Sequence, residues 1–144
     1  MKYRFYNKSA GYHPKVGESF YRLQSVDGNI PNKRRQHYLL NTLSFFANGI
    51  SDCKRLLMLI EQVETNSQEQ VLIEGEDVEI VVTKNEVQVN ILVNDDWMDN
   101  PEGVFTLKEF KLIISAWMVF LQLPESSDSE VVITLPETEF ESSI

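Results

Sequence analysis

Hydrophobic and polar residues alternate in some parts of this 144-residue chain and recur every three or four positions in others. Residues 3–6 and 19–25 alternate and are rich in aromatic side chains, which predicts two β-strands. Residues 9–17 between them are expected to form a loop. From residue 32 to about residue 65 the helical spacing dominates, and Asn48-Gly49 interrupts it, so two helices joined by a tight corner are expected.

Three short apolar runs then predict an antiparallel meander. They cover residues 70–73, 78–83 and 86–93, and short polar turns separate them. In the third run, Val87, Val89 and Ile91 alternate mainly with polar residues. One face of this sheet is therefore expected to be buried and the other to face solvent.

The C-terminal part predicts one more helix and one more strand. Thr106 and Glu109 have the spacing of a capping box, in which each side chain binds the backbone amide of the other residue. The helix that follows is apolar over more than half of its circumference, so it is expected to lie centrally across the sheet, and Pro124 ends it. Residues 130–135 are expected to form the last strand.

These elements together predict an α+β fold. We expect an antiparallel sheet of about five to six strands, with a helical hairpin and a central C-terminal helix packed on it. The length favours a single domain, which we place at residues 1–136, and residues 137–144 are expected to be a flexible acidic tail.

Composition narrows the class of protein. Hydrophobic residues make up 42% and charged residues 24% of the chain, which is typical of a globular domain. Cys53 is the only cysteine, and together with a charged N-terminus and the absence of a long apolar segment it leads us to expect a cytoplasmic protein. The sequence pI of 4.7 argues against nucleic acid as the main ligand.

Charge is divided unevenly between the two parts of the chain. Residues 1–60 carry ten Lys and Arg against three acids, whereas residues 61–144 carry three Lys against nineteen acids. Such a strongly negative segment indicates a positively charged partner, because the acids repel one another unless something compensates them.

The sequence predicts no catalytic residue, metal site or cofactor. His13 and His37 are the only histidines and neither has a carboxylate close in sequence, and no glycine-rich phosphate loop is present. Cys53 falls on an apolar helical face, where burial would keep its thiol unreactive.

One basic run leaves two alternatives open. Lys33, Arg34 and Arg35 lie in the first turns of the predicted helical region, where positive charge is slightly unfavourable. They either pair with the acidic part of the same chain or bind a partner outside it.

The candidate binding site lies in the acidic part. A polar loop combines acids with a large aromatic side chain, as interface anchors often do, and its proposed binding residues are Asp95, Asp96, Trp97, Asp99 and Glu102. The alternative is that Trp97 folds back onto the core and the acids are merely solvated. The turns and the solvent face of the meander add further acids, and we include Glu74, Glu76, Asp77 and Glu79 in the candidate surface.

The order of these elements resembles the small immunity proteins of bacterial polymorphic-toxin and contact-dependent growth-inhibition systems. The resemblance lies in an aromatic N-terminal strand, a helical hairpin, an acidic meander, an acidic Trp loop and a capped helix bearing Phe110, Trp117 and Phe120. It implies a bacterial cytoplasmic inhibitor that binds a cognate protein toxin, such as a nuclease with a basic active-site cleft. The acidic pI and the lack of a long apolar segment separately lead us to expect neither nucleic acid nor membrane as a partner.

Two other classes of function stay open. The first is a structural or regulatory subunit that uses the acidic surface within a larger assembly. The second is an enzyme whose site is assembled from dispersed residues such as His37, Tyr38 and Asp52.

Overall fold

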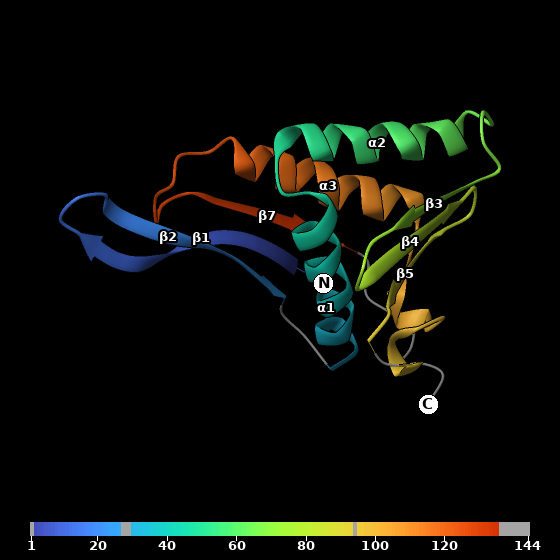
Figure 1. Cartoon of the computed structure of the whole chain (residues 1–144), viewed down its shortest axis with the longest axis horizontal. Coiled ribbons are helices and arrows are strands. Elements are labelled where there is room, and N and C mark those ends of the chain that lie inside the picture. Colours follow the sequence, from blue (N-terminus) through green and yellow to red (C-terminus); the bar gives the residue numbers. More distant parts are fainter. Residues whose placement is uncertain (1, 27–29, 94, 136–144) are drawn as a thin grey trace.

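The described part of the chain has an α+β fold, with three α-helices and seven strands in two antiparallel sheets (Figure 1). The computed structural model describes residues 2–26, 30–93 and 95–135. The predicted class is confirmed, but the strands are divided between two sheets where one sheet of five to six strands was expected. The reason is that the helices α1 (Ile30–Phe46), α2 (Ile50–Glu64) and α3 (Leu107–Leu121) need apolar partners on two sides, and each sheet offers one apolar face.

The three-stranded sheet has the order β2-β1-β7 and joins the two ends of the described chain. Its strands are β1 (Lys2–His13), β2 (Gly17–Val26) and β7 (Glu130–Thr134). Residues 9–13 were expected in a loop and are instead the second half of β1, paired with β2 up to His13↔Gly17. The second half of β1 lacks the alternating apolar residues that predict a strand. It lacks them because this half is exposed and covers no part of the core.

The four-stranded sheet has the order β3-β4-β5-β6 and contains the predicted meander. Its strands are β3 (Gln70–Glu74), β4 (Val78–Thr83), β5 (Val87–Ile91) and a short β6 (Val104–Phe105) that the pattern did not reveal. Val78, Ile80 and Val82 of β4 are buried against the helices, and the residues between them face outward. The expected division into one buried and one wetter face is confirmed for this strand.

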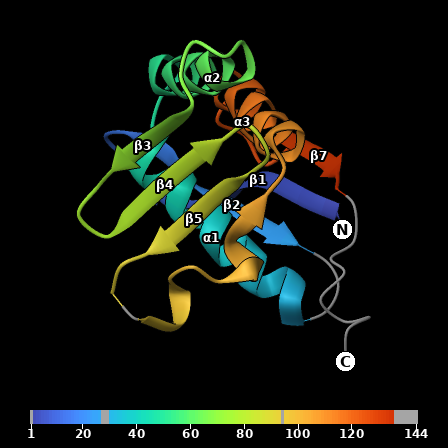
Figure 2. The ribbon, with the colours of Figure 1, turned by 90° about the vertical axis from the view of Figure 1, so that its right-hand side faces the viewer.

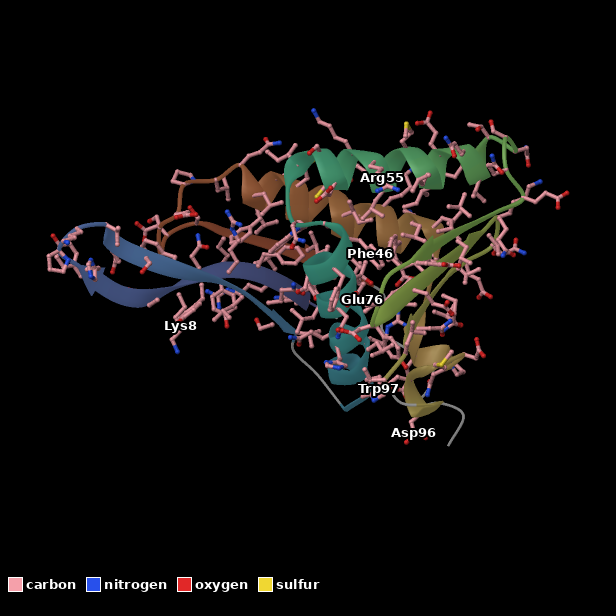
Figure 3. The ribbon with its side chains drawn as sticks, viewed as in Figure 1. Lys8, Phe46, Arg55, Glu76, Asp96 and Trp97 are labelled. Carbon is pink, nitrogen blue, oxygen red and sulfur yellow. The ribbon has the colours of Figure 1, made fainter. Side chains whose placement is uncertain are left out.

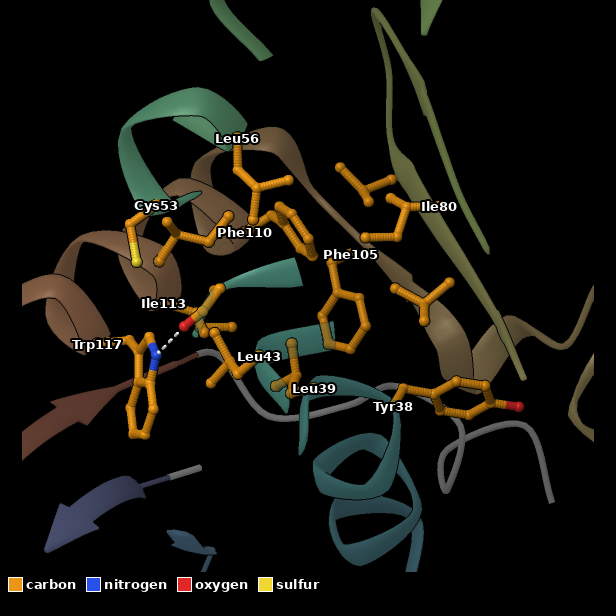
Figure 4. Packing of buried hydrophobic residues seen from close by; sticks show 14 of the residues in the cluster. Tyr38, Leu39, Leu43, Cys53, Leu56, Ile80, Phe105, Phe110, Ile113 and Trp117 are labelled. Carbon is orange, nitrogen blue, oxygen red and sulfur yellow. Dashed lines mark hydrogen bonds between the residues drawn. The ribbon is translucent and has the colours of Figure 1, made fainter. Parts of the chain in front are cut away.

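Helices α1, α2 and α3 meet the two sheets in one continuous core (Figure 4). The corner between α1 and α2 lies at Asn48-Gly49 as expected, and the buried indole of Trp117 in α3 donates to the carbonyl oxygen of Ala47 there, at 2.8 Å. Trp117 also lies 5.1 Å from the ring of Phe5 in β1, which joins α3 to the three-stranded sheet. The capping box of Thr106 and Glu109 is confirmed.

One close approach fixes α1 against the four-stranded sheet. A Cβ atom added at Gly103 would lie 2.5 Å from the carbonyl oxygen of Val89 and 2.9 Å from the ring of Tyr38. Glycine is therefore required where the chain enters β6.

None of the described helices is both long and apolar enough to cross a membrane.

Candidate functional site

Four acids are gathered at the turn between β3 and β4, which we call the acidic turn: Glu74, Glu76, Asp77 and Glu79. The amide of Gly75 donates to the carbonyl oxygen of Val78 at 2.9 Å and closes the turn. A Cβ atom at Gly75 would lie 2.9 Å from that oxygen and 3.0 Å from the ring of Phe46, so this tight packing needs glycine. The turn thus holds its acids on a rigid support.

Two of these acids face each other directly. Glu74 of β3 lies opposite Glu79 of β4 in the strand register. Like charges directly opposite one another on adjacent strands destabilise a sheet. Glu74, Glu76 and Asp77 are exposed and Glu79 is half-buried. The pair therefore places negative charge at the surface at some cost in stability.

The second acidic segment, residues 95–103, which we call the Trp97 loop, lies at the same end of the four-stranded sheet (Figure 2). Both β3 and β5 are antiparallel to β4, so their C-terminal ends lie at the same end of the sheet. The amide of Leu92, just after β5, donates to the carbonyl oxygen of Asp77 at 2.8 Å. The structure thus brings together two acidic segments that are about twenty residues apart in the sequence.

Asn90 links the acidic turn to the Trp97 loop. Its side-chain nitrogen donates to Oε1 of Glu79 at 2.9 Å, and its side-chain oxygen accepts from the amide of Asp99 at 2.7 Å. The Asn90 side chain is buried, so both hydrogen bonds are partly shielded from water. The sequence pattern did not single out this residue; the available signal was an amide side chain on the wetter face of a strand that lies between two acidic segments.

The Trp97 loop has its own internal support. Asn100 accepts from the amide of Glu102 at 3.0 Å and donates to the carbonyl oxygen of Asp96 at 3.1 Å. Gln88 of β5 donates to the carbonyl oxygen of Asn100 at 3.1 Å. Asp96 and Asp99 are exposed, and the side chain of Asp95 lies outside the described residues. The loop is held in place by its amide side chains, which leaves these two carboxylates at the surface.

Trp97 packs back onto helix α1 (Figure 3). Its ring lies 4.8 Å from the ring of His37 and 5.1 Å from that of Tyr38, and the side chain is half-buried against the core. This geometry corresponds to the alternative in which Trp97 folds inward, while part of the ring stays accessible. The residue therefore anchors the loop to α1, whatever it contributes to a partner.

Glu102 lies in the field of a buried cation. Arg35 of α1 is buried and pairs with Glu109 at 3.6 Å, and its guanidinium lies 4.3 Å from the centre of the Phe105 ring. Burial lowers the pKa of Arg35, and the negative charges of Glu109 and Glu102 offset part of this lowering. Arg35 of the basic run therefore pairs with an acid of the same chain. The side chains of Lys33 and Arg34 lie outside the described residues.

The acids of the acidic turn are not neutralised within the described part of the chain. The ion pairs there join Arg4 to Glu130, Arg22 to Glu125, Arg35 to Glu109 and Lys111 to Glu64. None of Glu74, Glu76, Asp77 and Glu79 pairs with a described Lys or Arg. The turn therefore presents its charge outward.

The dispersed residues considered for an enzyme are not brought together. His37 lies nine residues before the end of α1, whereas Asp52 follows the corner in the first turn of α2. At 1.5 Å per residue, the remaining part of α1 alone spans roughly 14 Å. Among the residues with described positions, no three His, Cys, Asp or Glu side chains are grouped to hold a metal ion.

Cys53 lies on the buried face of α2, as expected for a structural thiol. Burial raises its pKa, and the adjacent charge of Asp52 raises it further. A thiol with a raised pKa is a poor nucleophile at neutral pH.

Comparison with protein-family models, with curated proteins and with solved structures found no match to this chain.

Proposed function

We propose that this chain is a non-catalytic inhibitor that binds a basic protein toxin through the acidic turn and the Trp97 loop. The proposal follows the resemblance to bacterial immunity proteins and places the inhibitor in the cytoplasm. Its acids would occupy the positions of substrate phosphates in the toxin, for example in the cleft of a nuclease. The chain itself would need no cofactor.

One observation carries the proposal: four acids stand within six residues of a rigid turn, and none of them has an ion-pair partner among the described residues. Acids that merely face solvent need no fixed positions. Here the hydrogen bond between Gly75 and Val78 and the two hydrogen bonds of the buried Asn90 side chain fix the turn that carries them. Preorganised charge binds better because less conformational entropy is lost on association.

The mechanism of inhibition would be electrostatic and steric. An acidic surface steers a basic partner toward it and raises the association rate at low salt. The four-stranded sheet behind the acids would lie across the entrance of the catalytic cleft and block it. Trp97 would keep the loop acids in register with the turn through its packing on α1.

The test uses the product of the gene immediately upstream as the candidate toxin. Its C-terminal domain is expressed with and without this chain, and cell growth and co-purification are measured. The informative variant is Glu74→Gln with Glu76→Gln and Asp77→Asn. Its matched control, Glu61→Gln with Glu69→Gln and Asp128→Asn, removes the same charge from other exposed positions.

We expect the wild-type chain and the control to restore growth and to co-purify with the upstream domain, and the acidic-turn variant to fail in both. Binding should weaken as salt is raised, because exposed charges are screened. If the acidic-turn variant protects as well as the control, the site is wrong. If the upstream domain is harmless to cells and does not bind, the inhibitor proposal fails as a whole.

A further inference from the structure

Strand β3 is an outer strand of the four-stranded sheet and pairs with β4 on one side only (Figure 2). Its five residues pair without a register shift and include neither proline nor lysine. Proline, lysine and bulges are among the features by which natural sheets protect an edge from pairing with another chain. The edge of β3 lacks all three.

The backbone of β3 offers hydrogen-bonding groups at this edge. The amide of Gly75 donates to the carbonyl oxygen of Val78, so these two residues form a hydrogen-bonded pair of the antiparallel register. Such pairs alternate with pairs whose amides and carbonyls point away from each other. Residues 70, 72 and 74 belong to the second kind, so their amides and carbonyls point to the free edge.

The hydrogen bonds on the other side of β4 agree with this alternation. The amide of Leu92 donates to the carbonyl oxygen of Asp77, and the amide of Thr83 donates to that of Glu86. The odd-numbered residues of β4 therefore face β5, and their partners in β3 face outward. Within the described ranges, no hydrogen bond engages the outward backbone groups of β3.

The side chains of β3 are incompletely covered on both faces of the sheet. Leu72 is 47% exposed on the outer face, and Val71 and Ile73 are only half-buried on the face toward the helices. The apolar residues of the neighbouring β4 that face the helices are, by contrast, fully buried. An additional strand beside β3 would cover apolar surface on both faces, which an interface needs at its centre.

Acids surround this edge. Glu69 precedes β3, Glu74 ends it, and the acidic turn follows. None of these acids pairs with a Lys or Arg whose side chain the structure describes. A segment that carries Lys or Arg would match the edge, whereas a second copy of β3 would bring its own acids against it.

We propose that an extended segment of the basic partner pairs with β3 and adds a fifth strand to the four-stranded sheet. The inference rests on the proposed function and specifies how the partner binds. Main-chain hydrogen bonds to residues 70, 72 and 74 hold the segment, an apolar side chain of the segment covers Leu72, and its Lys or Arg lies beside the acidic turn.

Amide hydrogen exchange tests this pairing directly. The full chain is purified alone and in complex with the C-terminal domain of the upstream gene product, and exchange is followed residue by residue. The amides of Leu72 and Glu74 should exchange fast in the free chain and about tenfold or more slowly in the complex. The amides of Val71 and Ile73, which face β4 in both states, are the internal control.

A pair of variants separates the backbone of residue 72 from its side chain. Leu72→Pro removes the outward amide without removing a hydrogen bond of the sheet, as proline does at tolerated edge positions. Leu72→Ala keeps the amide and is the matched control. We expect Leu72→Pro to bind the upstream domain about tenfold more weakly than Leu72→Ala. Urea unfolding checks that both variants fold, and exchange in the wild type decides the question if Leu72→Pro does not.

Outward amides of β3 that exchange equally fast in the complex overturn the proposal, as does a folded Leu72→Pro that binds like Leu72→Ala. Loss of binding in the acidic-turn variant would then still support the proposed function. If the upstream domain does not bind the wild type, both proposals fail together. Protection of the same amides that grows with the concentration of the chain alone would place a second copy at the edge and would also overturn the inference.

Discussion

Arg35 of α1 pairs with Glu109 in the first turn of α3, and both side chains are nearly excluded from solvent. Nη1 of Arg35 also donates to the carbonyl oxygen of Val104 at 2.9 Å, while Glu109 accepts from the amide of Thr106 at 3.0 Å. One ion pair therefore joins α1, β6 and the N-terminal cap of α3. At this position, the basic N-terminal part and the acidic C-terminal part of the chain neutralise each other inside the fold.

Breaking this pair on one side should strongly destabilise the protein. Arg35→Met leaves Glu109 buried without its cation, and we expect a loss of about 3–5 kcal/mol in the free energy of unfolding. Arg35→Met with Glu109→Gln should lose clearly less than the sum of the single changes, because it leaves no unpaired buried charge. Urea unfolding measures the free energy of unfolding of Arg35→Met, of Glu109→Gln and of the double variant, with Arg55→Met at an exposed position as the control. Additive losses would contradict the prediction.

The like-charge pair in the acidic turn should make one substitution stabilising. Glu74→Gln removes the repulsion with Glu79 across the strands, and we expect a gain of about 0.2–1 kcal/mol in the free energy of unfolding. Glu76→Gln, in the turn and not opposite an acid, should gain less. Urea unfolding at low ionic strength compares the two, and equal effects would show that the pairing is not the cause.

Asn90 should control the order of the Trp97 loop. Asn90→Ala removes the partner of the Asp99 amide and of Glu79, and a buried group left unsatisfied costs about 1–3 kcal/mol. We expect faster hydrogen exchange at residues 95–103 and a lower free energy of unfolding. Asn41→Ala is the control, since Asn41 donates only to the preceding turn of its own helix. Unchanged exchange in the loop would refute this role.

Tyr3 should make the protein less stable at high pH. Burial raises the pKa of its hydroxyl, which donates to the side chain of Gln24. Between about pH 10 and the raised pKa, the unfolded chain releases the tyrosine proton and the folded chain keeps it, so the free energy of unfolding falls by up to about 1.4 kcal/mol per pH unit.

The matched variant for this prediction is Tyr3→Phe. It should be about 1 kcal/mol less stable than the wild type near neutral pH, because it lacks the hydrogen bond. Above about pH 10 its stability should fall less steeply, because it lacks the Tyr3 hydroxyl whose proton release differs between the folded and unfolded chain. Urea midpoints at several pH values give both slopes, and parallel curves would rule out a contribution from Tyr3.

The sequence by itself determined the elements whose cause is local. The alternation in β4 and β5, the interruption at Asn48-Gly49 and the spacing of Thr106 and Glu109 each depend on neighbours a few residues away. The α+β class follows from those elements, because apolar strand faces and helix stripes must cover one another. The unequal distribution of charge was also evident from the sequence, since it requires no folding to be counted.

Tertiary structure alone decided what these elements face. The division into two sheets, the projection of residues 8–21, the inward packing of Trp97 and the burial of Arg35 all depend on contacts between segments far apart in the chain. The candidate surface shows the same limit: its acids could be named from the sequence, but their gathering depends on Asn90 and on the shared direction of β3 and β5. Local patterns specify which residues are apolar or charged, and only the folded chain specifies which of them meet.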